Sequence, residues 1–193
     1  MSPAGRRIQA VAMGASWGGL DAFSRLLGGL PEALPVPIVL VQHQRHDAGE
    51  KLPALLSRRT ALEVVSPEDR DVLEPGRVYV APPGYHMLVD AARRVCFSMG
   101  PPVHYSRPAI DELFFSAGYV YGSGLLGVLM TGANNDGAAG LRYIRMRGGI
   151  TLVQDPATAE AAAMPASAIE AGAAMEVGDP DQLGHYIMEE VFG

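Results

Sequence analysis

The stretch IQAVAMGASWGGLDAFSRLL, residues 8 to 27, decides the fold. Its first part, 8 to 13, is a short apolar run followed by glycine, as expected of a buried parallel strand. Its second part places leucine and phenylalanine on one face of a helix that stops at Gly28, Gly29 and Pro31. The stretch therefore predicts a strand, a glycine-rich turn and a helix in direct succession.

Apolar runs and helix-like segments continue to alternate along the chain. Further strands are expected at 37 to 41, 62 to 65, 125 to 130 and 150 to 153, and helices at 20 to 30, 50 to 59, 108 to 121, 137 to 146, 165 to 171 and 180 to 191. This order predicts an α/β fold with a doubly wound, mostly parallel sheet and helices on both faces. Residues 78 to 80, 86 to 89 and 95 to 97 are separated by turns, and we expect them to form a short antiparallel hairpin at one edge.

Composition limits the class of protein. A chain of 193 residues with 48% hydrophobic and 19% charged residues predicts one packed domain spanning residues 1 to 193. The net charge of -6 argues against a nucleic-acid partner, because phosphate backbones attract basic proteins. Cys96 is the only cysteine, so no internal disulfide is possible.

The amino-terminal segment superficially resembles an export signal, with Arg6 and Arg7 before an apolar run. The run is short, contains Gln9 and leads directly into the expected helix, so a first strand explains it better. No stretch approaches the roughly 20 apolar residues that span a bilayer. We therefore expect a cytoplasmic protein that does not insert into membranes.

Three expected strands end in polar residues, at the edge where open α/β sheets bind ligands. The first end carries Ser16 in the pattern G-x-S-x-G, which presents a serine hydroxyl on a sharp turn between a strand and a helix. The second carries His43 after Gln42, and the third carries Asp136 before another expected helix. These residues are the candidate functional groups.

Each candidate also has a simpler interpretation. The glycine-rich turn could hold a nucleotide phosphate, although it lacks both the dinucleotide fingerprint and the lysine of a P-loop. His43 could be structural, or could bind zinc with His46, although no acidic or cysteine partner stands at helical spacing. Asp136 could simply cap the helix that follows it.

The three residues are more informative together than singly. A serine hydroxyl is a weak nucleophile unless a histidine accepts its proton, and the histidine needs a carboxylate to fix its tautomer. The chain supplies these groups in the order Ser16, His43, Asp136. The usual α/β-hydrolase order is serine, acid, histidine, so a lipase-like fold is disfavoured.

The combination resembles the catalytic domain of the chemotaxis protein-glutamate methylesterases, the CheB type, over about residues 8 to 178. The motifs that carry the resemblance are Gly-Ala-Ser-x-Gly-Gly at 14 to 19, Gln-His at 42 to 43, the segments 73 to 82 and 127 to 132, Ser106-Arg107-Pro108 with Asp111 and Phe114, Asn-Asp-Gly-Ala-Ala-Gly at 135 to 140, and Met164-Pro165. The resemblance implies that Ser16 is the nucleophile, His43 the base and Asp136 the acid.

The resemblance also implies a reaction and a partner. The substrate would be a methylated glutamate on the cytoplasmic helices of a methyl-accepting chemoreceptor, and deamidation of receptor glutamines would use the same acyl-enzyme chemistry. Neither reaction needs a cofactor or a metal. A basic group formed by Arg45, Lys51, Arg58 and Arg59 could meet acidic receptor helices or simply solvate a surface.

The sequence departs from the family pattern near the nucleophile. Trp17 replaces a threonine, Gln44-Arg45 replaces a segment that usually holds proline, and Ala133-Asn134 replaces Met-Gly in the segment expected to form the oxyanion hole. Trp17 could narrow the pocket, donate its indole N–H or pack beside the first helix. These changes leave open a catalytically weakened scaffold that still binds receptors, and a nucleotide-binding domain is a third alternative.

A receiver domain commonly precedes this catalytic domain in the family, whereas here the first strand is expected within ten residues of Met1. We expect either a protein that works without that domain or a shortened sequence. In the first case, a separate phosphorylation-signalling protein becomes a second candidate partner.

Overall fold

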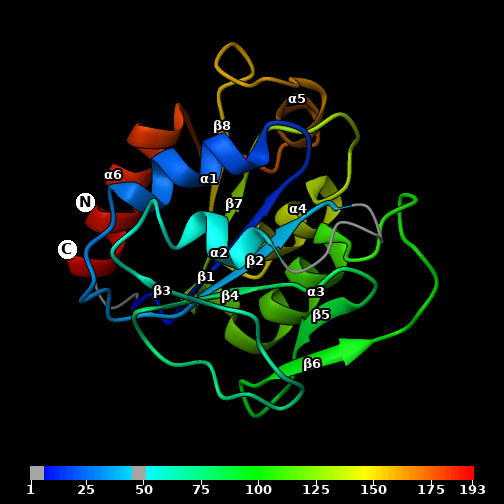
Figure 1. Ribbon diagram of the computed structural model, residues 1–193. Helices are drawn as coiled ribbons and strands as arrows, with labels where there is room; N and C mark the ends of the chain where they lie inside the picture. Colours follow the sequence, from blue (N-terminus) through cyan, green and yellow to red (C-terminus); the bar gives the residue numbers. More distant parts are fainter. Residues whose placement is uncertain (1–6, 45–50) are drawn as a thin grey trace.

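A computed structural model describes residues 7–44 and 51–193 (Figure 1). Its centre is a seven-stranded sheet in the order β3-β4-β2-β1-β7-β8-β9, in which all neighbouring strands are parallel. The strands are β1 (Ala10–Ala15), β2 (Ile38–Gln42), β3 (Glu63–Val65), β4 (Arg77–Val80), β7 (Leu125–Leu129), β8 (Ile150–Gln154) and β9 (Glu176–Gly178). The predicted α/β class with a mostly parallel sheet is confirmed.

Helices cover both faces of the sheet (Figure 1). One face carries α1 (Gly19–Gly28), α2 (Leu52–Leu56) and α6 (Pro180–Phe192), whose buried residues join one core with Val11 and Met13 of β1. The other face carries α3 (Ile110–Tyr121), α4 (Ala138–Met146) and α5 (Ala163–Glu170), which join a second core with Ala10 and Ala12. This alternation along β1 is the two-residue period of a strand buried on both faces.

The antiparallel hairpin is present but does not form an edge of the main sheet. It consists of β5 (His86–Val89) and β6 (Val95–Ser98), which pair only with each other among the described strands. Residues 78 to 80, which we expected beside it, belong to β4 and pair in parallel with β2 and β3. The hairpin is held instead by burial, because Met87, Val89 and Val95 join the core beneath α3.

The chain winds outward in both directions from β1. The β2 strand lies on one side of it and β7 on the other, after a short 3-10 turn at Gly122–Gly124. Such a reversal of winding opens a crevice at the carboxyl ends of the strands, where ligands bind in this class of fold. Across residues 7–44 and 51–193, the structure contains no helix with the length and apolar character that crossing a bilayer requires.

Candidate active site

The ends of three adjacent strands meet where the sequence predicted. The register pairs Ala15 with Gln42, so the residues that follow them, Ser16 and His43, leave the sheet side by side. The amide of His43 donates to the carbonyl oxygen of Ala15 at 3.0 Å, and the amide of Ser16 donates to the carbonyl oxygen of Thr131 at 2.8 Å. These bonds join the end of β1 to the segments that follow β2 and β7.

The turn that carries Ser16 requires glycine for steric reasons. Gly18 has φ +80°, a left-handed conformation that L side chains rarely adopt. A Cβ atom on Gly19 would lie 2.8 Å from Cβ of Ala15 as well as 1.9 Å from Oε1 of Gln42, so this position also excludes larger residues. The two glycines form the N-cap and first residue of α1, which therefore begins three residues after Ser16. The serine is thus kept near the amino end of a helix, where backbone N–H groups favour negative charge.

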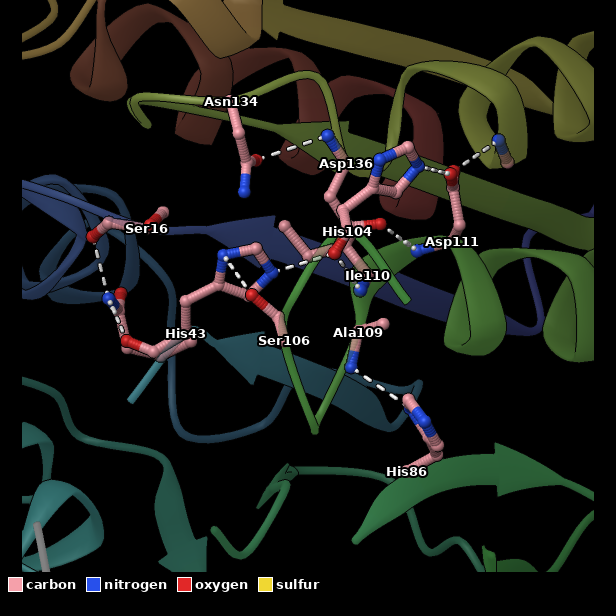
Figure 2. Close-up of polar contacts among 12 residues, drawn as sticks. Ser16, His43, His86, His104, Ser106, Ala109, Ile110, Asp111, Asn134 and Asp136 are labelled. Atoms are coloured by element: carbon pink, nitrogen blue, oxygen red, sulfur yellow. Dashed lines mark hydrogen bonds and ion pairs between the residues drawn. The ribbon is translucent and has the colours of Figure 1, made fainter. Parts of the chain in front are cut away.

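Asp136 is fully buried and is held by three donors (Figure 2). His43 Nε2 lies 2.7 Å from its Oδ2, and the amides of Ile110 and Asp111 donate to its two oxygens at 2.7 and 2.9 Å. Burial by itself would raise the pKa of this carboxyl. The hydrogen bonds from His43 and from the two amides outweigh burial, so the pKa of Asp136 lies below its ordinary value. The carboxylate is therefore a stable anion.

The interpretation of Asp136 as a cap of the following helix is wrong. The N-cap of α4 is Gly137, with φ +91° and no side-chain cap. Asp136 instead turns inward and binds the first two amides of α3, which lie 26 and 25 residues earlier in the chain. The amino end of α3 supplies unpaired N–H groups and a favourable dipole for this anion.

His43 has one nitrogen bound to Asp136 and the other beside a different serine. Its side chain is 9% exposed, and Nδ1 lies 3.3 Å from Oγ of Ser106. We expected the hydroxyl of Ser16 at this nitrogen, but the described residues include no hydrogen bond between Ser16 and His43. The structure thus brings all three candidates to one edge of the sheet, with the His43–Asp136 contact formed and Nδ1 shared with Ser106 (Figure 2).

The residues expected near the oxyanion lie in the loops around the same edge. Trp17 is 66% exposed, so its ring does not pack away beside α1. Asn134 accepts the amide of Asp136 through Oδ1 at 3.1 Å, which makes it part of the loop that positions the carboxylate. Ala133 is exposed, and within the described residues neither its amide nor that of Trp17 donates a hydrogen bond. Both N–H groups are therefore free to bind an oxyanion.

Two supporting residues were not identified from the sequence. Gln42 donates through Nε2 to the carbonyl oxygen of Ser16 at 2.6 Å, and Thr131 donates through Oγ1 to the carbonyl oxygen of Trp17 at 2.8 Å. Both therefore fix the backbone that follows the Ser16 side chain. The available signal was their position, because each is a buried polar residue at or just after the end of an apolar strand.

A second histidine–aspartate pair lies behind Asp136. His104 Nε2 is 3.3 Å from Oδ2 of Asp111, and the amide of Gly140 donates to the other carboxylate oxygen at 2.7 Å. Burial is the main reason that the pKa of Asp111 is raised. In the described part of the chain, His104, Asp111 and Asp136 are the one group whose ligand atoms could meet at a metal. Their oxygens already accept N–H donors, so we assign the group to hydrogen bonding.

Of the other histidines, His86 has a structural role. His86 is buried and accepts the amide of Ala109 at Nδ1 (Figure 2). Its Nε2 contacts the carbonyl oxygen of Pro101. It therefore supports the start of α3, whose amides hold Asp136. His46, considered above as a zinc ligand, and Arg45 of the basic group lie outside the described residues.

Known proteins are similar to this chain in sequence and in fold. Residues 11–187 match the family model described as CheB methylesterase. A protein of Leptospira interrogans assigned as a protein-glutamate methylesterase/protein-glutamine glutaminase is 44% identical over 163 residues, which is 84% of each chain. The protein-glutamate methylesterase FrzG of Myxococcus xanthus is 41% identical over 181 residues, 94% of this chain but 54% of FrzG.

The structural comparison agrees. The crystal structure of the Thermotoga maritima CheB methylesterase catalytic domain superposes with a TM-score of 0.90 at 30% identity, covering 94% of this chain and 98% of that one. The match therefore extends over nearly the whole of a catalytic domain. The chain belongs to the CheB methylesterase family.

Proposed function

We propose that this protein hydrolyses glutamate methyl esters on chemoreceptors, with Ser16 as nucleophile, His43 as general base and Asp136 as the orienting acid. The observation that carries the proposal is the 2.7 Å contact between His43 Nε2 and Asp136 Oδ2 at the strand ends that also hold Ser16. Because the carboxylate is ionised, it fixes the tautomer with the proton on Nε2. The lone pair is then on Nδ1, at the nitrogen available to a serine hydroxyl.

The reaction follows from these positions. Nδ1 of His43 takes the proton of Ser16 as Oγ attacks the ester carbonyl, and Asp136 stabilises the imidazolium that forms. The tetrahedral intermediate collapses, the C–O bond to methoxide breaks, and the imidazolium protonates the leaving group to give methanol. Water then attacks the acyl-enzyme with His43 again as base, which releases the glutamate carboxylate and restores Ser16.

The free amides of Trp17 and Ala133 are the proposed oxyanion donors. They come from the turn after β1 and from the loop after β7, two strands that are neighbours in the sheet. Two N–H donors directed at a developing oxyanion are the usual arrangement for acyl transfer. Asn134 acts indirectly, because its side chain is bound to the amide of Asp136.

The same chemistry extends to a receptor glutamine, whose amide carbonyl would form the same acyl-enzyme with loss of ammonia. The proposed partners are the cytoplasmic helices of a methyl-accepting receptor, which places the activity in the cytoplasm. A separate phosphorylation-signalling protein is a further proposed partner, and residues 1 to 193 are proposed to form one catalytic domain. The weakened scaffold and the nucleotide-binding domain are not favoured, because the proteins matched are methylesterases.

A fluorophosphonate probe tests the nucleophile directly, since it reacts only with an activated hydroxyl. We expect the wild type to be labelled at Ser16, and Ser16→Ala to lose both labelling and methanol release from a methylated receptor fragment by at least about 10³-fold. Peptide mapping separates Ser16 from Ser106. Labelling at Ser106, or methanol release at the wild-type rate from Ser16→Ala, would exclude the proposed nucleophile.

A further inference from the structure

A groove of about 620 Å³ lies next to the triad, outside the residues used by the proposed reaction. It is lined by residues of α3, α4 and α5. The lining side chains used in the argument are Phe115, Ala138, Ala139, Arg142, Tyr143 and Met146.

One end of the groove lies beside residues that surround the buried carboxylate of the triad. Asn135, which immediately precedes Asp136, lines one end, as does Asp111, whose amide binds Asp136. The α4 helix then forms the floor from Ala138 to Met146, a length of about 13 Å at 1.5 Å per residue. An elongated occupant seated on α4 would therefore have one end beside the loop that carries Asp136.

The shape and chemistry of the groove suit an amphipathic helix. Ala138 and Ala139 leave space on the floor, while Phe115 and Tyr143 form an edge-to-face pair with ring centroids 5.4 Å apart. Met146 is 74% exposed at the far end. Aromatic and methionine side chains around a shallow apolar groove are the usual surface for the apolar face of a helix.

Apart from His104, the charged residues that line the groove are Arg142 and the nearly buried Asp111, and the helical segment beside it is basic although the protein as a whole is acidic. The segment 138 to 147 carries three arginines and no acidic residue, in a chain of net charge -6. Arg145 donates to the carbonyl oxygens of Gly172 and Ala174, and Arg147 lies over the ring of Tyr119. Within the described residues Arg142 has no such partner, so its guanidinium is available to an external carboxylate.

We propose that this groove binds the receptor helix beside the ester under attack, with Arg142 paired to a glutamate carboxylate of that helix. The inference rests on the proposed function, because demethylation and deamidation both leave glutamate on the substrate helix. An acidic, amphipathic helix fits both the apolar floor and the unpaired arginine. The groove thus serves affinity for the receptor and takes no part in the chemical step.

Two substitutions test the groove by different means. Arg142→Glu replaces the arginine of the groove with an acidic side chain. Ala139→Trp places a large side chain in the groove at a position that is exposed to solvent. For a soluble receptor cytoplasmic fragment carrying glutamate methyl esters, each should raise KM by about 10-fold, as like-charge contact or lost burial would. Hydrolysis of a small acetate ester and fluorophosphonate labelling of Ser16 should stay within about twofold of the wild type. Arg94→Glu, the same charge change on the exposed β5–β6 turn, should leave KM unchanged.

The proposal is overturned if KM for the receptor fragment is unchanged in both groove variants, or if Arg94→Glu raises it equally. It is also overturned if small-ester hydrolysis falls together with receptor turnover, because the groove would then act through Asp136. Failure of the proposed function shows separately, as a wild type that neither reacts with the probe nor releases methanol. The dissociation constant of the same fragment for Ser16→Ala, measured with and without Arg142→Glu, tests the groove in the absence of turnover. It should rise when Arg142→Glu is added.

Discussion

The hydroxyl of Ser106 lies 3.3 Å from Nδ1 of His43, the nitrogen that must accept the proton of Ser16 in the proposed mechanism. The imidazole is already oriented by Asp136 at Nε2 and by burial of the ring. Ser106 is therefore not needed to aim the ring. Its hydroxyl instead lies at the nitrogen that acts as the base in that mechanism.

Removing the Ser106 hydroxyl should free Nδ1 for Ser16. A single neutral hydrogen bond changes an equilibrium by about 2- to 10-fold, so Ser106→Ala should be labelled at Ser16 about 2- to 10-fold faster by a fluorophosphonate. Ser98→Ala is the matched control. Ser98 lies at the end of β6 and its hydroxyl binds the amide of Gly100, so this variant should label at the wild-type rate. Slower labelling of Ser106→Ala would show that the hydroxyl assists His43.

Substitution of Asp136 should affect both catalysis and stability. In Asp136→Asn an N–H of the amide would face His43 Nε2, which favours the wrong tautomer, and turnover should fall by up to about 10⁴-fold. The amide also cannot accept from Ile110, Asp111 and His43 together, so unfolding free energy should fall by about 1–3 kcal/mol. Steady-state kinetics and urea unfolding measure the two effects, and wild-type turnover by a folded variant would contradict the role given to Asp136.

Asp136 and Asp111 should change the stability of the protein in opposite directions as pH varies. The pKa of Asp136 is lowered in the folded protein. Its contribution to stability is therefore present above the pKa of the unfolded chain, about 3.9, and is lost as pH falls through the pKa of the folded protein. The pKa of Asp111 is raised by burial, so the folded protein binds this proton more tightly. Stability therefore falls as pH rises from the pKa of Asp111 in the unfolded chain to its higher pKa in the folded protein.

Asp111→Asn isolates the second effect. The variant keeps the backbone amide that binds Asp136 but has no carboxyl to ionise, so it should melt at a higher temperature than the wild type at pH 7. The difference should vanish below about pH 4, where the wild-type carboxyl is protonated. Thermal unfolding across pH provides the measurement, with the exposed Glu170→Gln as control. A lower melting temperature at pH 7 would show that the bonds to His104 and Gly140 outweigh burial.

The exposed ring of Trp17 should act on access rather than on folding. Because its side chain is 66% exposed, Trp17→Thr should change the free energy of unfolding by no more than about 0.5 kcal/mol. We expect faster demethylation of a receptor fragment, by about 2- to 5-fold if relief of crowding is worth about 0.4–1 kcal/mol, and little change for a small ester. If both substrates slow together, the indole N–H stabilises the oxyanion and the ring does not restrict access.

The sequence by itself determined the features that depend on local pattern. Alternating apolar strands and amphipathic helices predicted the doubly wound sheet, and the strands that became β1, β2 and β7 were each recognised from a continuous apolar run. Parallel strands in such a sheet end at the same edge, so Ser16, His43 and Asp136 could be brought together without knowledge of any contact. The motifs around them were sufficient to indicate the family.

Only the tertiary structure decided the features that depend on packing between distant segments. The short β9 and the membership of β4 in the parallel sheet are set by neighbouring strands, since three or four residues carry too little pattern. Asp136 reads locally as a helix cap, yet it binds α3, because α3 is packed against the start of α4. Ser106 reaches His43 across 63 residues of sequence. Spacing along the chain carries no information about such contacts, because burial and side-chain packing determine which of several polar groups meets the base.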